Sequence, residues 1–331
     1  MTRERIKKET IISLLKESSG YVSGAKMASQ LGVTRAAVWK TMVLLKKDGY
    51  LIESSPAKGY LLVESPDLCI ADLKKNIAAT KKIGHELFFY DSVPSTNMVA
   101  MELASQGCPD GTVVISDAQT AGKGRLGRSW SSPPGKNLYM SIVLRPGISP
   151  RDATALTLLA AVACASVLRR FASIPVSIKW PNDLIVGHRK MGGILTEIKA
   201  DLDRINYAIV GIGININLTA EEMPQEIKAI ATSIFIETGG HFSRSELAGA
   251  LILNFDKWYR LLLTKGKKVI TNEWLTMSST IGKRIRVTAM NQTFEGVAEG
   301  IDDEGRLIVK LHEGTYRKVS AGDITMVRTN S

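Results

Sequence analysis

Two short helical segments with capping residues at both ends constrain the fold of this chain most strongly. Ser23 precedes the first segment and Gly32 follows it, while Thr34 precedes the second and Gly49 follows that. Ser and Thr side chains satisfy free backbone N–H groups at helix N-termini, and Gly readily takes the left-handed conformation that ends a helix. Two short helices joined by a tight glycine-containing turn are typical of a helix-turn-helix.

The segments around this pair predict a winged helix over residues 1–64. Upstream, apolar residues recur at the spacing of an amphipathic helix. These residues are Ile6, Ile11, Ile12, Leu14 and Leu15. Downstream, Tyr50–Ser54 and Lys58–Val63 are predicted to form a hairpin with its tip at residues 55–57. Three helices followed by a two-stranded wing make a winged helix.

The charge of this segment favours an anionic partner. Residues 1–64 hold eleven Lys and Arg against six Asp and Glu, and the whole chain has a formal charge of +11. Such an excess favours DNA, nucleotide phosphates or an acidic protein. The residues expected to contact DNA lie on the third helix and the wing: Thr34, Arg35, Trp39, Lys40 and Lys58. The alternative is a solvated basic face on a winged helix that binds protein.

The middle of the chain predicts one mixed α/β domain around a sheet. Pro66 and the charged stretch 72–82 are expected to connect it to the first domain, and strands alternate with helices from Phe88 to about Thr264. The predicted strands are Thr112–Ser116, Leu138–Leu144, Val176–Lys179, Gly193–Ile198 and Tyr207–Gly213. From Ile281 the pattern changes to short β runs that suggest a small β-barrel. These runs are Arg284–Ala289, Thr293–Ile301, Leu307–Leu311 and Tyr316–Val319, with a turn at Asn291–Gln292.

Composition predicts a cytoplasmic protein without a membrane partner. The first ten residues are too charged for a signal peptide. The longest apolar run, Ala155–Leu168, is too short to span a bilayer and is expected to form a buried helix with Ser149 as its N-cap. The three cysteines are scattered and form no motif for zinc or a disulfide framework.

The segment from Gln119 to Trp130 carries the most chemical information. Its glycines fit G-x-G-x-x-G after a strand, but the following Arg128–Gly135 run cannot open the helix that a dinucleotide site requires. Cations stand among the glycines: Gly122, Lys123, Gly124, Arg125, Gly127 and Arg128. Glycines let the backbone approach a ligand, and the cations pair with phosphate or carboxylate oxygens. We therefore interpret this segment, called the basic loop below, as an anion-binding loop; a solvent-exposed loop that contacts DNA is the alternative.

Polar residues at predicted strand ends add to this interpretation. Pro181 is expected to fix a turn from which Asn182 and Asp183 project toward ribose, base or magnesium, although Asn-Asp in a turn is most often a plain turn. Lys190, close to Gly192-Gly193, suggests an ammonium group that faces an anion.

Two further polar segments have open interpretations. Asn215 and Asn217, predicted on one side of a strand, could read an adenine edge or fix the following turn. Ser95 or Thr96 could cap a helix or face the pocket. Because no nucleophile is paired with a base, the inventory favours chemistry by positioning and charge neutralisation, as when a carboxylate attacks the α-phosphate of ATP.

Together these segments resemble the biotin–protein ligases, and the winged helix makes the chain similar to the bifunctional members that also repress the biotin operon. The glycine-rich basic loop, Lys-Trp-Pro-Asn-Asp and Arg-Lys-x-x-Gly-Ile-Leu carry the resemblance, which covers essentially the whole chain. It implies an α+β multidomain fold with a class II synthetase-like ligase core and an SH3-like C-terminal barrel. The domains would span residues 1–64, 65–272 and 273–331.

The resemblance also implies roles for individual residues. Biotin would be held by Ser95, Thr96, Asn97, Gln119, Lys123, Gly124, Arg125, Lys190 and Gly193, of which Lys123, Arg125 and Lys190 would be catalytic. The nucleotide would be held by Gly122, Gly127, Arg128, Asn182, Asp183 and Asn215. Residues Thr219–Ser233 resemble a mobile cover over the adenylate. Lys123 and Leu126 differ from the arginines that members often carry, and Leu126 suggests an apolar contact inside the closed loop.

The implied reaction joins biotin and ATP, with Mg²⁺, into biotinyl-5′-AMP and pyrophosphate. The biotinyl group would then pass to a lysine of a biotin carboxyl carrier protein, and the adenylate-bound homodimer would bind a two-fold operator. Two alternatives stay open: a lipoate or octanoate ligase, and a ligand-sensing transcription factor without catalysis.

Overall fold

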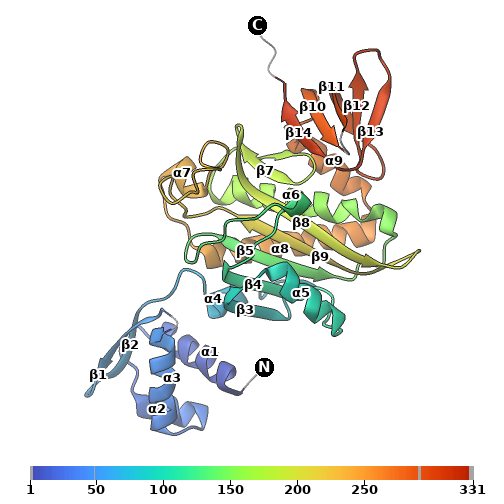
Figure 1. The fold of residues 1–331 in the computed structure, drawn as a ribbon. Helices are drawn as coiled ribbons and strands as arrows, with labels where there is room; N and C mark the ends of the chain where they lie inside the picture. The colour runs from blue at the N-terminus through green and yellow to red at the C-terminus, as the bar shows by residue number, and fades with distance from the viewer. Residues whose placement is uncertain (1–2, 48, 290–291, 328–331) are drawn as a thin grey trace. The chain divides into compact units, whose positions relative to one another are not determined.

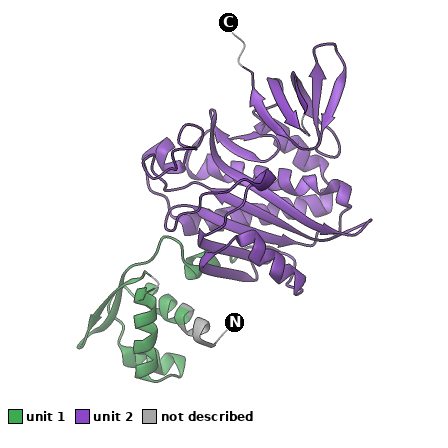
Figure 2. Cartoon of the chain, viewed as in Figure 1, with its two compact units in different colours: residues 1–78 green, residues 79–331 purple. Residues whose placement is uncertain are grey.

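The computed structural model describes residues 3–47, 49–289 and 292–327. The chain separates into two compact units, residues 1–78 and residues 79–331 (Figure 2). The predicted domain boundaries near residues 64 and 272 stay predictions, because a division into two units does not test a division into three.

The first unit contains the expected winged helix. Its helices and strands are α1 (Arg3–Lys16), α2 (Gly24–Leu31), α3 (Arg35–Lys47), β1 (Leu51–Ser55) and β2 (Gly59–Glu64). The predicted caps are confirmed: Ser23 Oγ accepts the Lys26 N–H at 3.1 Å, and Thr34 Oγ1 accepts the Ala37 N–H at 3.2 Å. Gly32 ends α2 in the left-handed conformation. Ile11, Ile12 and Leu15 enter the core as expected, whereas the side chain of Ile6 lies outside the described residues.

Residues 72–82 were expected to be a connecting segment, but they overlap helix α4 (Ile70–Asn76), so this prediction is wrong in part. Leu73 and Ile77, four residues apart, are both buried, and Lys16 of α1 forms an ion pair with Asp72. An apolar pair at this spacing lies on one face of a helix. Because lysines surround Leu73 and Ile77 in the sequence, this short apolar face was not recognised there.

The second unit is built on a seven-stranded sheet in the order β3-β4-β5-β9-β8-β7-β6 (Figure 1). The strands are β3 (Leu87–Val93), β4 (Val113–Gln119), β5 (Leu138–Leu144), β6 (Ser177–Lys179), β7 (Asp183–Val186), β8 (Arg189–Ala200) and β9 (Ile205–Ile214). Strands β3 and β4 pair in parallel, and the other neighbours are antiparallel. The five predicted strands are confirmed, β5 with the predicted ends and the other four with shifted ends; β3 and β7 had not been predicted as separate strands.

Some helices of the second unit pack on this sheet, others pack against those helices, and one of them is long and apolar. The helices are α5 (Thr96–Ser105), α6 (Thr154–Phe171), α7 (Ile234–Thr238), α8 (Arg244–Lys265) and α9 (Lys268–Met277). The segment Pro150–Phe171 is long and apolar enough to cross a membrane, but 67% of its apolar window is buried inside the fold, as expected for a core helix. Ser149 caps the short 3-10 turn Pro150–Asp152 that precedes α6, rather than α6 itself.

The C-terminal part of the second unit is a five-stranded antiparallel sheet in the order β13-β12-β11-β10-β14. Its strands are β10 (Arg284–Ala289), β11 (Gln292–Ile301), β12 (Leu307–Leu311), β13 (Tyr316–Val319) and β14 (Asp323–Met326). The predicted change to short β strands is confirmed, and β14 is an additional strand. Of the expected turn, Asn291 lies outside the described residues and Gln292 begins β11.

A buried carboxylate on α8 holds the first residues of the second unit. Asp256 is 2% exposed, and its Oδ1 accepts the backbone N–H groups of Lys81, Lys82 and Ile83 at 3.2, 2.6 and 3.0 Å. Burial alone would raise the pKa of Asp256, but these hydrogen bonds and one from Arg260 outweigh it and hold the pKa below its ordinary value.

We expect Asp256→Asn to lower the free energy of unfolding by about 1–3 kcal/mol at pH 7. Because the folded pKa is depressed, this stabilisation is present above the unfolded pKa near 4 and is lost as the pH falls through the folded pKa. Urea denaturation of both proteins between pH 7 and pH 2.5 measures the difference. A difference that stays constant over this range would show that the carboxylate charge is not the cause.

Candidate active site

A cavity of about 920 Å³ lies in the second unit, where the basic loop, strands β6 to β9, residues 218–231 and strand β14 meet. Its size falls within the range of small-molecule sites. The structure brings to this cavity most of the predicted site residues: Ser95, Thr96, Asn97, Gln119, Gly122, Lys123, Gly124, Arg125, Arg128, Asn182, Asp183, Lys190, Gly193 and Asn215. Gly127 was also predicted, but it is absent from the lining and forms an exposed part of the loop with φ +75°.

The polar end of the cavity is formed by the start of α5 and the end of β4. Ser95 occupies the N-cap position of α5, but its side chain makes no capping hydrogen bond. Instead, Gln119 Oε1 accepts the Thr96 N–H at 2.9 Å, and Gln119 Nε2 donates to Ser132 Oγ at 2.9 Å. These two contacts fix the orientation of the Gln119 amide. Hydroxyl and amide groups of fixed orientation suit a small polar group with both donors and acceptors.

Asn97 lines the cavity, and hydrogen bonds to residues of the sheet fix its side chain. Its Nδ2 donates to Glu197 Oε2 at 2.7 Å and to the Leu195 carbonyl at 3.3 Å, and its Oδ1 accepts from Ser141 Oγ at 2.6 Å. A Cβ at Gly211 would lie 2.2 Å from Asn97 Oδ1, so this strand position requires glycine. Asn97 therefore contributes to the shape of the polar end through its supporting contacts.

Lys190 on β8 supplies a positive charge to the cavity. Its ammonium lies 2.5 Å from the Asp183 carboxylate and 5.5 Å from the centre of the Trp130 ring. The Trp130 ring lies against β9, where a Cβ at Gly213 would approach the ring to 2.8 Å. A cation held between a carboxylate and an aromatic face is positioned to exchange its partner for an incoming anion.

Arg125 brings a second cation from the basic loop. Its Nη1 donates to Asn182 Oδ1 at 3.1 Å, while Asn182 Nδ2 donates to the Ile194 carbonyl at 2.6 Å. Burial lowers the pKa of Arg125, and the charges of Asp183 and Asp323 oppose this shift. Arginine nevertheless remains protonated in proteins, so this partly desolvated guanidinium acts on an anion more strongly than an exposed one would.

The far end of the basic loop contacts the C-terminal sheet. Arg128 forms an ion pair with Asp323 at the start of β14, and this contact raises the pKa of Arg128. The Lys123 side chain is exposed at the cavity. Leu126 is 68% exposed with φ +56°, so the apolar contact expected inside the loop is not made in this conformation.

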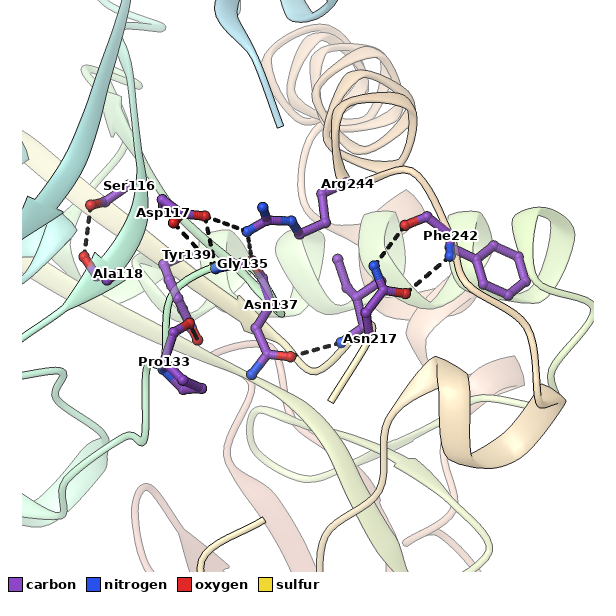
Figure 3. Close-up of polar contacts among 11 residues, drawn as sticks. Ser116, Asp117, Ala118, Pro133, Gly135, Asn137, Tyr139, Asn217, Phe242 and Arg244 are labelled. Atoms are coloured by element: carbon purple, nitrogen blue, oxygen red, sulfur yellow. Dashed lines mark hydrogen bonds and ion pairs between the residues drawn. The ribbon is translucent and has the colours of Figure 1, made fainter. Parts of the chain in front are cut away.

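Asn215 and Asn217 follow the end of β9 at Ile214, so their predicted place on the strand was wrong. Asn215 Nδ2 donates to the Thr232 carbonyl at 3.0 Å. Asn217 makes two hydrogen bonds with the Phe242 backbone, at 2.9 and 3.0 Å (Figure 3). Of the two interpretations, these contacts favour amides that fix the chain. The expected cover, Thr219–Ser233, consists of turns and a β-bridge between Ala231 and Lys190, and several of its residues line the cavity.

Several residues of the site were missed in the sequence. Trp130, Ser132 and Asp323 carried no motif of their own, although Trp130 ends the basic loop. Within residues 3–47, 49–289 and 292–327, no group of three or more His, Cys, Asp or Glu could hold a metal ion. Two cations at the cavity, Lys190 and Arg125, suit binding an organic acid and a phosphate ester side by side, because they can neutralise both charges.

A separate surface of the first unit carries the predicted DNA contacts. Arg35 and Lys40 are exposed on α3, and Trp39 between them is 58% exposed. Thr34 is exposed at the cap of α3, and Lys58 lies 5.6 Å from the centre of the Tyr21 ring near the wing. Arg35 and Trp39, four residues apart, lie on one face of α3, the helix that contacts DNA in this fold class.

These features define a class of protein in which a helix-turn-helix unit is joined to an α/β core with a cavity lined by lysine and arginine side chains. The chain matches the family models described as HTH domain over residues 7–61, Biotin/lipoate A/B protein ligase family over 89–215 and Biotin protein ligase C terminal domain over 280–327. The chain belongs to the biotin/lipoate A/B protein ligase family, within the group of relatives called bifunctional ligase/repressors.

Relatives and solved structures cover most or all of the chain. It is 39% identical over 325 residues to the bifunctional ligase/repressor BirA of Bacillus spizizenii, covering 98% of this chain and 99% of the relative. It is 29% identical over 316 residues to that of Escherichia coli, covering 96% of each chain. The structure of biotin protein ligase from Aquifex aeolicus in complex with biotin and ATP has a TM-score of 0.64 and 28% identity, covering 74% of this chain and 100% of that one.

Proposed function

We propose that this chain is an ATP-dependent biotin–protein ligase that also acts as a biotin-responsive transcriptional repressor. The observation that carries the proposal is the identity of 39% with a bifunctional ligase/repressor over 98% of the chain. The cavity supports it, because a polar end and two cations suit an acid that must meet a phosphate.

In the first step, a carboxylate oxygen of biotin attacks the α-phosphorus of ATP, and pyrophosphate leaves. Ser95, Thr96 and Gln119 would hold the polar ring of biotin. Lys190, Arg125 and Lys123 would neutralise the carboxylate and the phosphate, since two anions must meet. Gly122, Arg128 and Asn182, which line the cavity, would hold the nucleotide, which would extend toward the C-terminal sheet.

In the second step, a lysine amine of a biotin carboxyl carrier protein attacks the acyl carbon of biotinyl-5′-AMP, and AMP leaves. The amine loses a proton as the amide forms. Magnesium would enter with the phosphates of ATP, with the Asp183 carboxylate as a ligand, and would supply further charge neutralisation. A single carboxylate with nucleotide phosphates fits the oxygen ligands that this ion takes.

The finer assignments belong to the same proposal. They are a class II synthetase-like core over residues 65–272, an SH3-like barrel over residues 273–331, and a cytoplasmic protein without a membrane partner. An adenylate-bound homodimer would place two winged helices on a two-fold operator. Operator affinity that is equal with and without biotin and ATP would contradict this coupling.

A pyrophosphate-exchange assay tests the enzymatic part. We expect purified protein to exchange labelled pyrophosphate into ATP with biotin, and not with lipoate or octanoate at the same concentration. Exchange with lipoate or octanoate alone would identify a ligase for the other acid. Binding of biotin without any exchange would identify a sensor without catalysis.

A further inference from the structure

A carboxylate that does not line the cavity holds the two ends of the basic loop together. Asp117 lies near the end of β4, before the loop, and Gly135 lies after the loop. Both oxygens of the Asp117 carboxylate accept the Gly135 N–H, at 3.1 and 3.2 Å (Figure 3). The backbone adds a contact between Gln119 N–H and the Ser132 carbonyl at 3.2 Å. The side chain of Asp117, in the segment that leads into the loop, therefore holds the backbone of Gly135, in the segment that leaves it. These two segments are called the stems of the loop.

A buried arginine joins this contact to helix α8. Arg244 is 4% exposed, and its Nη1 donates to Asp117 Oδ1 at 2.6 Å and to the Asn137 carbonyl at 3.3 Å. Arg244 is the first residue of α8, where the helix dipole disfavours a cation. A buried cation at this position needs a compensating anion, and Asp117 supplies it.

The contacts continue from this pair to the other wall of the cavity. Asn137 Oδ1 accepts the Ile216 N–H at 3.0 Å, and Asn137 Nδ2 donates to Asn215 Oδ1 at 3.4 Å. Asn215 in turn donates to the Thr232 carbonyl near the end of the expected cover. A hydrogen-bonded path thus links the stems of the basic loop, the end of β9 and the cover.

We propose that Asp117 and Arg244, here called the stem pair, are positioning residues that hold the basic loop and the cover closed over the ligand. This inference rests on the proposed function. Neither residue is among those that line the cavity, so neither touches the reacting atoms. Fixed stems shorten the part of the loop that must be ordered on closure, which lowers its entropic cost. Loss of the stem pair should therefore speed the escape of the adenylate more than it slows the chemistry.

The test compares two full-length variants with a matched control. The double variant Asp117→Asn/Arg244→Met removes both charges at similar volume, and Arg244→Lys keeps the charge without the fork. Asp256→Asn is the control, because it also neutralises a buried carboxylate paired with an arginine of α8 but lies away from the loop. Trypsin cleavage after Lys123, Arg125 and Arg128 reports loop order without ligand. The half-life of bound biotinyl-5′-AMP after gel filtration reports ligand retention.

In the double variant we expect loop cleavage to accelerate about tenfold and the adenylate half-life to fall about tenfold. The exchange rate at saturating substrate should stay within about threefold, and Arg244→Lys should recover part of the retention. The inference is overturned if the double variant matches Asp256→Asn in both measurements. If the double variant does not fold, Arg244→Lys and Asp117→Asn must each shorten retention relative to the control. If wild type forms no adenylate, the proposed function fails, while cleavage without ligand still decides the role of the stem pair.

Discussion

Replacing Lys190 by alanine is expected to lower biotin-dependent pyrophosphate exchange roughly 10²- to 10³-fold in kcat/KM, as for loss of one preorganised group that stabilises transition-state charge. The Lys190 ammonium is held at the cavity by Asp183 and the Trp130 ring. Substrate anions would replace Asp183 as its partner, and the alanine variant leaves their charge unneutralised. The loss should appear in kcat as well as in the KM for biotin, because the charges approach each other most closely in the transition state.

Lys199→Ala is the matched control for this substitution. Lys199 lies on the same strand and is exposed, with its ammonium 5.9 Å from the centre of the Tyr207 ring. We expect its exchange rate to stay within about twofold of wild type, as for surface substitutions away from a site. Full exchange by a protein carrying both Lys190→Ala and Arg125→Ala would show that the cations of the site are assigned wrongly.

Replacing Arg35 and Trp39 together by alanine is expected to lower operator affinity roughly 10²- to 10³-fold, since each base contact contributes about 1–3 kcal/mol. Both side chains are exposed on α3, which is the recognition helix of this fold class. Because the operator is unidentified, the probe is DNA selected by wild type from a random duplex library in the presence of biotin and ATP. Fluorescence anisotropy at several salt concentrations measures the affinity.

Lys75→Ala provides the charge-matched control in the same unit. Lys75 is exposed on α4, outside the helix-turn-helix, so its removal should change the affinity by less than about threefold. Pyrophosphate exchange should be unchanged in all three proteins. Equal loss of affinity in Lys75→Ala and the double variant would indicate binding through general charge rather than through α3.

The first unit followed closely from the sequence because its signals are local. Ser23, Gly32 and Thr34 act on backbone groups within a few residues, so their roles are written in the chain itself. Helix α4 was missed because its stability comes from burial of Leu73 and Ile77 against other elements, and its own composition is charged. Tertiary packing decides such short helices more than intrinsic propensity does.

The cations of the candidate site could be predicted from the sequence, but the residues that hold them in place could not. The basic loop, Asn182, Asp183 and Lys190 form recognisable runs, and the structure brings them to one cavity. Asp117 and Arg244 lie 127 residues apart in sequence, so no local pattern indicates their contact. Asn215 and Asn217 were placed on a strand because alternation continues past Ile214, whereas their side chains bond to backbone that approaches from Thr232 and Phe242.

Because strand β14 forms part of the cavity wall, the cavity can be completed only late in the synthesis of the chain. Asp323, Ile324 and Thr325 form part of the cavity wall, and Asp323 pairs with Arg128 of the basic loop. A nascent chain on the ribosome therefore has no complete cavity until β14 has emerged and folded onto residues made almost two hundred positions earlier. Chains that stop before Gly322 lack the wall on the nucleotide side, so they should form no adenylate and release no activated acyl group into solution.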